Sequence, residues 1–371
     1  CASACGRPSS IASSSTSRGG QTKIMTAKER VLAALAFEKT DRFPIYNTFW
    51  GEFEEIWRRQ KGLGPDVNIY DYYGIDLVYI APDETPFPSR KRTLEETPER
   101  TIARDGWGAV TETHQGAKFF ETVAVALPDK ADLDRLEFES PQLAGRFPAH
   151  EQVRQLEAKR CVFVKTGGPY LRTSNLRGSE QWLIDLAEDP QFARELAMRV
   201  TDHMTAVGLE AMRRFNLYDT GIWFYDDMAC NRGPMFSPAT FERVFLPCYS
   251  KMCRAYREAG ARHILLHSDG NIEPILDMLI DAGIEGINPI EPKAGMDVVK
   301  LRQRYGRKLA LLGGLDNAHI LAQGTAAEIE AHVRHVMSAG AEGGLVVAAH
   351  SIGPDIPVAN YELVHRIVHG A

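Results

Sequence analysis

The sequence lacks the features that mark membrane, nucleic-acid-binding and disulfide-stabilised proteins. No apolar run approaches the ~20 residues that a membrane helix needs, and no run of Lys and Arg provides a basic patch for nucleic acid. With a formal net charge of −6, we expect neither nucleic acid nor a membrane among its partners. No CxxC pair and no secretory signal occur. We therefore expect a reduced, cytoplasmic setting in which cysteines serve as small apolar side chains.

Residues 1–24 are rich in Ser, Gly and Thr and lack the apolar core of a signal peptide. They contain Arg and Ser but no acidic residue, as an organellar transit peptide also would, so that alternative stays open. The first methionine, Met25, stands directly before a helix start. We expect residues 1–24 to form a disordered upstream extension and residues 25–371 to form one enzyme domain.

Eight short, β-rich apolar runs alternate with helical stretches. Most runs are continuously apolar, as expected for parallel strands that are buried on both faces. Capping boxes at Thr26 with Glu29 and at Thr325 with Glu328 mark two of the helix starts. The runs cover residues 44–48, 77–82, 162–168, 221–227, 263–269, 286–292, 309–316 and 344–350. This alternation predicts an α/β fold, a single (β/α)₈ (TIM) barrel. A doubly wound open sheet is the rival, because counting strands does not show closure.

One stretch, residues 84–145, interrupts the alternation. Within it, the turn dipeptides Asp105-Gly106 and Gln115-Gly116 separate segments of alternating polarity. Such a pattern is typical of antiparallel strands joined by tight turns. The sequence therefore predicts a β-hairpin insertion after strand 2, in a position to cap the barrel mouth.

Polar residues end most of the eight runs, at the carboxyl ends where a barrel builds its active site. Ionisable groups are costly to place beside apolar runs unless they are solvated or paired, so their convergence indicates a site. The residues at these ends are Asn47, Asp83, Tyr170 after a Gly-Gly-Pro turn, Tyr225, Asp226, Asp227, His267, Asp269, Glu291, Asp316 and His350.

The sharpest constellation is His267, Asp269 and His350. Residues i and i+2 of a strand point to the same face, so the side chains of His267 and Asp269 can contact the same ligand. His350 ends the last strand, which neighbours the first in a closed barrel. Two imidazoles and a carboxylate can hold Zn²⁺ with an open position, as catalytic zinc sites do. The same groups can also bind an anionic substrate and transfer protons without a metal.

The other strand-end residues take supporting roles in this prediction. Adjacent strand residues point to opposite faces, so only one of Asp226 and Asp227 enters the mouth. We predict that Asp227 does so, as a catalytic acid, base or hydrogen-bond acceptor, and that Asp83 and His350 are further catalytic residues. The residues predicted to contact substrate are Asn47, Tyr170, Tyr225 and Glu291.

Several segments resemble the uroporphyrinogen decarboxylase superfamily over about residues 26–370, most strongly after residue 160. They include GGPYL, FYDDMACNRGPMFSPATFERVFLPCYSKM, LLHSDGNIEPILDMLIDAGIEGINPIEPKAGMD, LLGGLDNAHILAQGTAAEI and AAHSIGPDIPVANYELV. The superfamily contains true uroporphyrinogen decarboxylases and methyltransferases that move methyl groups between corrinoid proteins and thiols or other acceptors. The resemblance implies a single barrel domain, which favours closure over the open sheet.

The resemblance also implies a choice between activities. True decarboxylases carry an arginine-rich motif just after the first strand, whereas Arg58 and Arg59 are shifted here onto a predicted helix behind acidic residues. His350 matches an active-site histidine of the decarboxylases. Zinc methyltransferases use a His-x-Cys pair and a later Cys, and those positions match His267, Asp269 and His350. Both cysteines are therefore replaced, which leaves a harder set of two nitrogens and one oxygen.

We expect a methyltransferase-like enzyme that transfers a methyl group between a small substrate and a corrinoid, carried by a partner protein, or another acceptor. Zn²⁺ is the cofactor that we expect for this methyltransferase hypothesis. One alternative is a decarboxylase acting on an anionic tetrapyrrole or related substrate, which would need no cofactor. The other is a non-catalytic module that docks a corrinoid protein. A homodimer is compatible with each.

Overall fold

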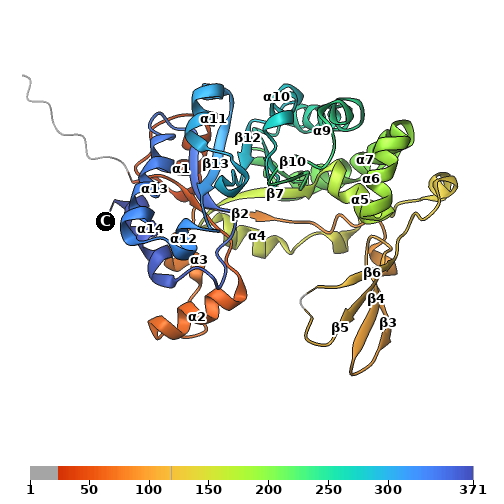
Figure 1. Cartoon of the computed structure of the whole chain (residues 1–371), viewed down its shortest axis with the longest axis horizontal. Coiled ribbons are helices and arrows are strands. Elements are labelled where there is room, and N and C mark those ends of the chain that lie inside the picture. The colour runs from red at the N-terminus through yellow and green to blue at the C-terminus, as the bar shows by residue number, and fades with distance from the viewer. Residues whose placement is uncertain (1–23, 118, 371) are drawn as a thin grey trace, which may run out of the picture.

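Eight parallel strands with flanking helices form a nearly closed barrel in the computed structural model, which describes residues 24–117 and 119–370. All eight predicted runs contain a strand, so the TIM-barrel prediction is confirmed (Figure 1). In spatial order the strands are β1 (Ile45–Tyr46), β14 (Leu345–Ala349), β13 (Ala310–Leu315), β12 (Gly286–Asn288), β11 (His263–His267), β8 (Gly221–Tyr225), β7 (Cys161–Gly167) and β2 (Leu77–Ile80). The predicted extension lies, but for residue 24, outside the described residues.

Asp76 joins the first and last strands of this order at the seam of the barrel. Its backbone N–H donates to the carbonyl oxygen of Ile45 in β1 at 3.0 Å, and its carboxylate accepts the Ile45 N–H at 3.0 Å. The same carboxylate is 1% exposed and pairs with Arg30 and Arg42, each at 2.6 Å. A buried charge is tolerated when it is paired and hydrogen-bonded. This cluster therefore supplies polar contacts where β1 and β2 share no ladder.

Alternate strand residues divide the interior into two cores. Outward-facing side chains such as Val164, Phe224 and Leu266 pack beneath the helices. The inward row forms a separate cluster with residues of α1, the helix that precedes β1; its members include Val31, Leu35, Tyr46, Leu77, Phe163, Trp223, Leu265, Leu312 and Val346. Because side chains alternate along a strand, the next inward positions toward the carboxyl ends are 165, 225 and 267.

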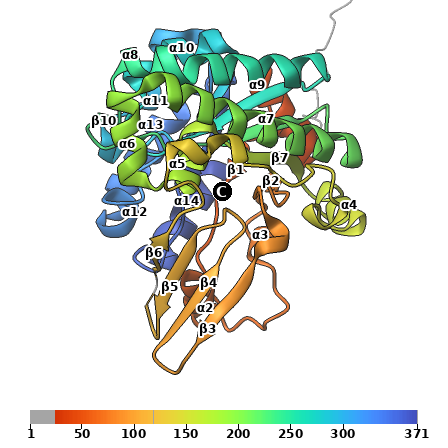
Figure 2. The ribbon, with the colours of Figure 1, turned by 90° about the vertical axis from the view of Figure 1, so that its right-hand side faces the viewer.

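Helices surround the barrel (Figures 1 and 2). The predicted capping boxes at Thr26 and Thr325 are both present. The α-helices are α1 (Ala27–Leu35), α2 (Gly51–Lys61), α3 (Ile69–Tyr72), α4 (His150–Glu157), α5 (Pro169–Arg177), α6 (Ser179–Glu188), α7 (Pro190–Phe215), α8 (Pro238–Thr240), α9 (Leu246–Glu258), α10 (Glu273–Ala282), α11 (Val298–Tyr305), α12 (Ile320–Gln323), α13 (Ala326–Ser338) and α14 (Val358–His369). Within residues 24–117 and 119–370, no helix has the length and apolar content that crossing a bilayer requires.

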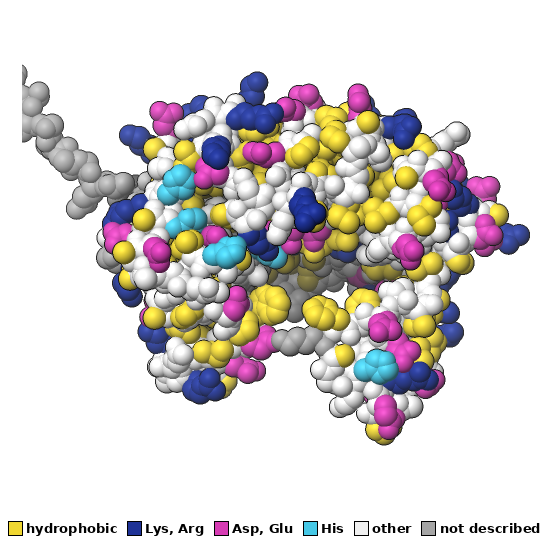
Figure 3. Space-filling view, in the orientation of Figure 1, with side chains coloured by type: hydrophobic (Ala, Val, Ile, Leu, Met, Phe, Trp, Pro, Cys, Tyr) yellow, Lys and Arg dark blue, Asp and Glu magenta, His cyan; other side chains and the backbone are white. Residues whose placement is uncertain are grey.

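The predicted insertion after β2 is present and is larger than a single hairpin. It forms a four-stranded antiparallel meander of β3 (Arg92–Glu96), β4 (Arg100–Arg104), β5 (Val110–His114) and β6 (Glu121–Ala124). Its sheet projects away from the barrel (Figures 1 and 2), while the β4–β5 turn brings Trp107 over the guanidinium of Arg172 at 5.5 Å. Figure 3 shows a broad hollow between this sheet and the part of the molecule that carries α2. A second ribbon, β9 (Ala229–Cys230) with β10 (Gly233–Pro234), follows β8.

Candidate active site

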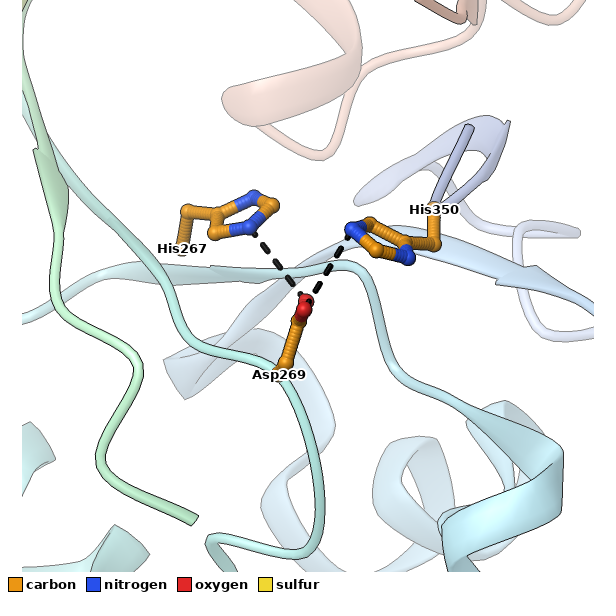
Figure 4. A group of neighbouring side chains, drawn as sticks. All are labelled: His267, Asp269 and His350. Carbon is orange, nitrogen blue, oxygen red and sulfur yellow. Dashed lines mark ion pairs between the residues drawn. The ribbon is translucent and has the colours of Figure 1, made fainter. Parts of the chain in front are cut away.

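The structure brings His267, Asp269 and His350 together at the carboxyl ends of β11 and β14 (Figure 4). One ligand atom from each side chain lies within 4.8 Å of the other two. The Nε2 atom of His267 is 3.4 Å from Asp269 Oδ1, and the Nε2 atom of His350 is 3.3 Å from Asp269 Oδ2. The side chains of Asp269 and His350 are 30% and 31% exposed, so the cluster is open to solvent on one side.

Asn288 of β12 fixes the orientation of the His267 ring. Its amide nitrogen donates to the backbone oxygen of Leu312 at 2.7 Å, which turns its carbonyl oxygen toward His267 Nδ1 at 2.6 Å. A carbonyl oxygen only accepts, so Nδ1 must carry the proton. The lone pair of the neutral ring is then on Nε2, which faces Asp269. Sequence reasoning missed Asn288, although its inward position at the end of a strand was a readable signal.

Glu291 lies behind His350 and the Asp269 loop. Its carboxylate is 4% exposed and pairs with Lys293 at 2.9 Å and with His350 Nδ1 at 3.6 Å. The other carboxylate oxygen accepts the N–H of Gly270 at 2.8 Å. A Cβ on Gly270 would lie 2.6 Å from the backbone oxygen of Cys230, so the position of Gly270 against that segment requires glycine. The structure thus places Glu291 as a support for His350 rather than on the open side of the cluster.

Burial and charge act in opposite directions on Asp269. Burial raises the pKa of its carboxyl, but the imidazoles of His267 and His350, when they are protonated, and the ammonium of Lys293 lower it by more, so the net shift is downward. Asp269 is therefore ionised at neutral pH. A carboxylate in this form is a suitable metal ligand or proton acceptor.

The adjacent acids after β8 separate as the alternation rule requires. Asp227 is 25% exposed, lies 3.8 Å from His267 Nε2 and accepts the N–H of Asp269 at 3.1 Å. Asp226 is fully buried and accepts the N–H groups of Tyr170 and Leu171 in the first turn of α5. Asp227 is thus the acid that belongs to the cluster, and Asp226 holds the β7–α5 turn.

Tyr225 connects the histidine cluster to a neighbouring cavity. Its ring centroid is 5.0 Å from that of His267. Burial, followed by the charge of Asp227, raises the pKa of its hydroxyl, which stays protonated at neutral pH. The cavity on the other side has a volume of about 330 Å³; its lining includes Tyr79, Asp83, Glu84, Trp107, Lys165 and Arg172. Of these residues the sequence had singled out Asp83 alone.

Three of the predicted site residues do not reach the cluster. Asn47 is fully buried and faces the other way, with its amide bonded to the Ala349 N–H and to Tyr361. Its inward-facing neighbour is Tyr46, so the same alternation that separates Asp226 from Asp227 accounts for this difference. Asp83 lines the cavity, but its carboxylate is held by Lys91 at 2.6 Å.

Tyr170 is the third. Its ring packs against Phe236 and Phe245, at 5.2 and 5.8 Å between centroids. Burial raises the pKa of its hydroxyl to about 12. Packing between α5 and the segment before α9 accounts for this residue.

The donor atoms of the cluster fit a divalent metal with nitrogen and oxygen ligands. The Nε2 atoms of two imidazoles and a carboxylate converge on one region. Asp269 Oδ1 is buried and accepts no hydrogen bond within the described residues. Buried polar atoms nearly always have a partner, so an orphaned oxygen beside two imidazole nitrogens is chemically suited to a cation. Without a metal, the same groups can bind and transfer protons.

Comparisons with known proteins agree with this architecture. A family model described as uroporphyrinogen decarboxylase (URO-D) matches residues 112–371. A methyltransferase from Methanosarcina mazei shares the fold, with a TM-score of 0.69 and 18% identity over 93% of this chain and 98% of that chain. A B12-independent methionine synthase from Shewanella sp. W3-18-1 is more distant, with a TM-score of 0.45 and 13% identity over 81% of this chain and 83% of that chain. The search of curated proteins found no match.

Proposed function

Because this chain belongs to the uroporphyrinogen decarboxylase family, we propose that it is a methyltransferase-like member that transfers a methyl group between a small substrate and a corrinoid or another acceptor. One observation carries the proposal: ligand atoms of His267, Asp269 and His350 lie within 4.8 Å of one another at the barrel mouth. Three protein ligands with an open side are the usual arrangement of a catalytic zinc site. A corrinoid would be brought by a partner protein.

In this proposal His267, Asp269 and His350 hold Zn²⁺. When bound, the metal supplies Lewis acidity that polarises an oxygen- or nitrogen-bearing substrate group. Asn288 acts as a positioning residue, since it keeps the His267 lone pair on Nε2. Glu291, whose carboxylate oxygen lies 3.6 Å from Nδ1 of His350, places a negative charge beside that ring.

Asp227 is the acid that can exchange a proton with the substrate. It lies beside the cluster, 3.8 Å from His267 Nε2, and is partly exposed to the mouth. Its Oδ1 already accepts one backbone N–H, which holds the side chain in place. A substrate hydroxyl, amine or thiol that loses its proton before the methyl group moves can pass that proton to this carboxylate.

The decarboxylase alternative has less support in the charges near the mouth. A tetrapyrrole with several carboxylates needs several cations. Arg58 is held by Glu54 at 3.1 Å and donates to the backbone oxygen of Val67. Arg59 is exposed on α2. Acidic groups at the cluster, by contrast, repel an anionic ring.

Metal content and turnover of the purified full-length chain test the proposal. We expect about one zinc per chain in the wild type, measured by inductively coupled plasma mass spectrometry, and its loss in His267→Ala and Asp269→Ala. His335→Ala is the matched control, since His335 also pairs with an aspartate, Asp297 at 2.9 Å, but on the exposed side of α13. Demethylation of methylcobalamin by a panel of thiols, alcohols and amines, followed by absorbance, should be lost in the same two variants and kept in the control.

Other outcomes point elsewhere. Turnover of uroporphyrinogen to a less carboxylated product, with no dependence on metal, would establish a decarboxylase and remove the methyltransferase proposal. If the protein has neither zinc nor turnover and a corrinoid protein co-purifies with it, it is a docking module.

A further inference from the structure

Lys165 is a cation without a partner at the mouth of the barrel. It occupies an inward position near the end of β7, two residues after the buried Phe163. Its ammonium lies over the rings of Tyr79 and Tyr225, at 4.2 and 4.5 Å from their centroids. Within residues 24–117 and 119–370, no hydrogen bond or ion pair joins this ammonium to a side chain. Lysine is rarely buried without a charged partner, so the partly buried ammonium of Lys165 is suited to bind an anionic ligand.

The carboxylates around the same cavity are already neutralised. Asp83 pairs with Lys91 at 2.6 Å, and Glu84 pairs with Arg172 at 2.6 Å. These two pairs balance their charges within the cavity wall. The ammonium of Lys165 is then the charge in the cavity wall that these two pairs do not balance. Burial lowers its pKa to about 8, because the effect of burial exceeds the opposite effect of the nearby Asp227 carboxylate. At neutral pH the lysine is mainly protonated, so the cavity presents one positive charge.

The walls of the cavity are aromatic and flat. Tyr79, Tyr225 and Trp107 line it, and its volume is about 330 Å³, at the lower end of the range for small-molecule sites. The guanidinium of Arg172 lies over Trp107 at 5.5 Å and over Tyr225 at 5.6 Å, which keeps these surfaces in place. Such walls suit a planar apolar body, because aromatic faces bind flat groups by stacking and edge contacts.

The ring of Tyr225 joins this cavity to the histidine cluster. One of its contacts is the Lys165 ammonium at 4.5 Å, and another is the His267 ring at 5.0 Å between centroids. The ammonium is therefore at most about 9.5 Å from the His267 ring, the sum of these two distances. One small molecule can span that separation.

We propose that Lys165 binds the carboxylate of a small, planar, monoanionic substrate, whose opposite end reaches His267, Asp269 and His350. The assignment deepens the proposed function and rests on it only for the chemistry at that opposite end. It also explains why a single charge suffices here, where a tetrapyrrole would need several. Lys165 sets specificity because its ammonium attracts a carboxylate and is left partly desolvated and unpaired when a neutral analogue binds.

Binding of benzoate and benzamide to the purified full-length chain tests the assignment. The two probes have nearly the same shape and differ in charge. We expect the wild type to bind benzoate at least about tenfold more tightly than benzamide, as for a hydrogen bond to a charged group, measured by isothermal titration calorimetry. Lys165→Met should lose this preference, and Lys165→Arg should keep part of it. Lys159→Met is the matched control, because it removes a lysine that is paired with a carboxylate, Asp71, away from this cavity.

The outcomes separate this inference from the proposed function. Equal affinity of the wild type for both probes, failure to bind benzoate, or an unchanged preference in folded Lys165→Met would each overturn the assignment of Lys165. Circular dichroism shows whether that variant is folded, and Lys165→Arg provides the second test if it is not. Zinc content is read independently: a benzoate preference that depends on Lys165 in a protein without zinc supports this site and removes the metal-dependent function.

Discussion

Replacement of Asn288 by leucine tests the orientation of His267 most directly. Asn288 is 2% exposed and makes two short hydrogen bonds, to His267 Nδ1 at 2.6 Å and to the Leu312 carbonyl at 2.7 Å. Leucine has a similar size but accepts nothing, so the His267 ring loses the contact that holds its proton on Nδ1. The Nε2 lone pair then no longer faces Asp269 in every molecule.

The expected magnitude follows from those contacts. Loss of a partner in the surroundings of a metal ligand typically lowers metal affinity by about 10- to 100-fold. This range corresponds to about 1.4–2.8 kcal/mol, which agrees with the about 1–3 kcal/mol that one unsatisfied buried polar group costs. We therefore expect Asn288→Leu to bind Zn²⁺ about 10- to 100-fold more weakly than the wild type.

Competition with a chromophoric chelator measures this affinity. Asn288→Asp is the comparison variant, because its carboxylate still accepts the Nδ1 proton although it can no longer donate to the Leu312 carbonyl; its affinity should fall less than that of Asn288→Leu. Unfolding in urea shows how much of the effect is lost stability. If Asn288→Leu binds Zn²⁺ as tightly as the wild type while His267→Ala does not bind it, Asn288 does not position the ligand and the reasoning is wrong.

Three further substitutions test how the fold supports the site. His203 is buried, and burial lowers the pKa of its imidazole to about 4. The stability that the neutral ring contributes is therefore full above pH 6.5 and falls by about 3 kcal/mol as the pH drops toward 4. The difference in the free energy of unfolding in urea between wild type and His203→Gln should shrink across this pH window. Asp76→Ala leaves Arg30, which is 5% exposed, without one of its two acidic partners and should cost about 3–5 kcal/mol in the same assay; a loss below 1 kcal/mol would contradict the role of the seam cluster. Gly168→Ala places a Cβ 2.4 Å from the Asp226 side chain and should destabilise by about 1–3 kcal/mol; unchanged stability would show that the β7–α5 turn can shift freely.

Most of the fold could be predicted from local patterns. Each of the eight apolar runs became a barrel strand, because a strand buried on both faces needs apolar side chains at successive positions. The turn dipeptides near Asp105 and Gln115 marked two of the meander's connections. The strand β3 was not marked, because its residues are all exposed and carry no alternation. An exposed strand is held by its ladder to β4, which is a tertiary contact.

Side-chain direction along a strand accounts for two of the differences between the predicted site and the structure. Asn47 was assigned by its place at a strand end, but its inward-facing neighbour Tyr46 fixes it on the outer side of the barrel. The alternation rule that chose Asp227 over Asp226 would have excluded Asn47 as well. Lys165 was overlooked within an apolar run, where its charge and inward position together were the signal. Reading each strand end by its direction as well as its residue type would have corrected both.

The sequence by itself determined the residue types and their order along the chain: His267 and Asp269 two residues apart where one strand ends, Asp227 inward, and a histidine at the end of the last strand. It could not decide which strands become neighbours in space, since that depends on closure of the barrel and on the side chains that pack between strands. Only the tertiary structure brought His350 to within 3.3 Å of Asp269, turned Asp83 toward Lys91, and set Asn288 behind His267. These contacts join segments far apart in the chain, and no local pattern encodes their distances.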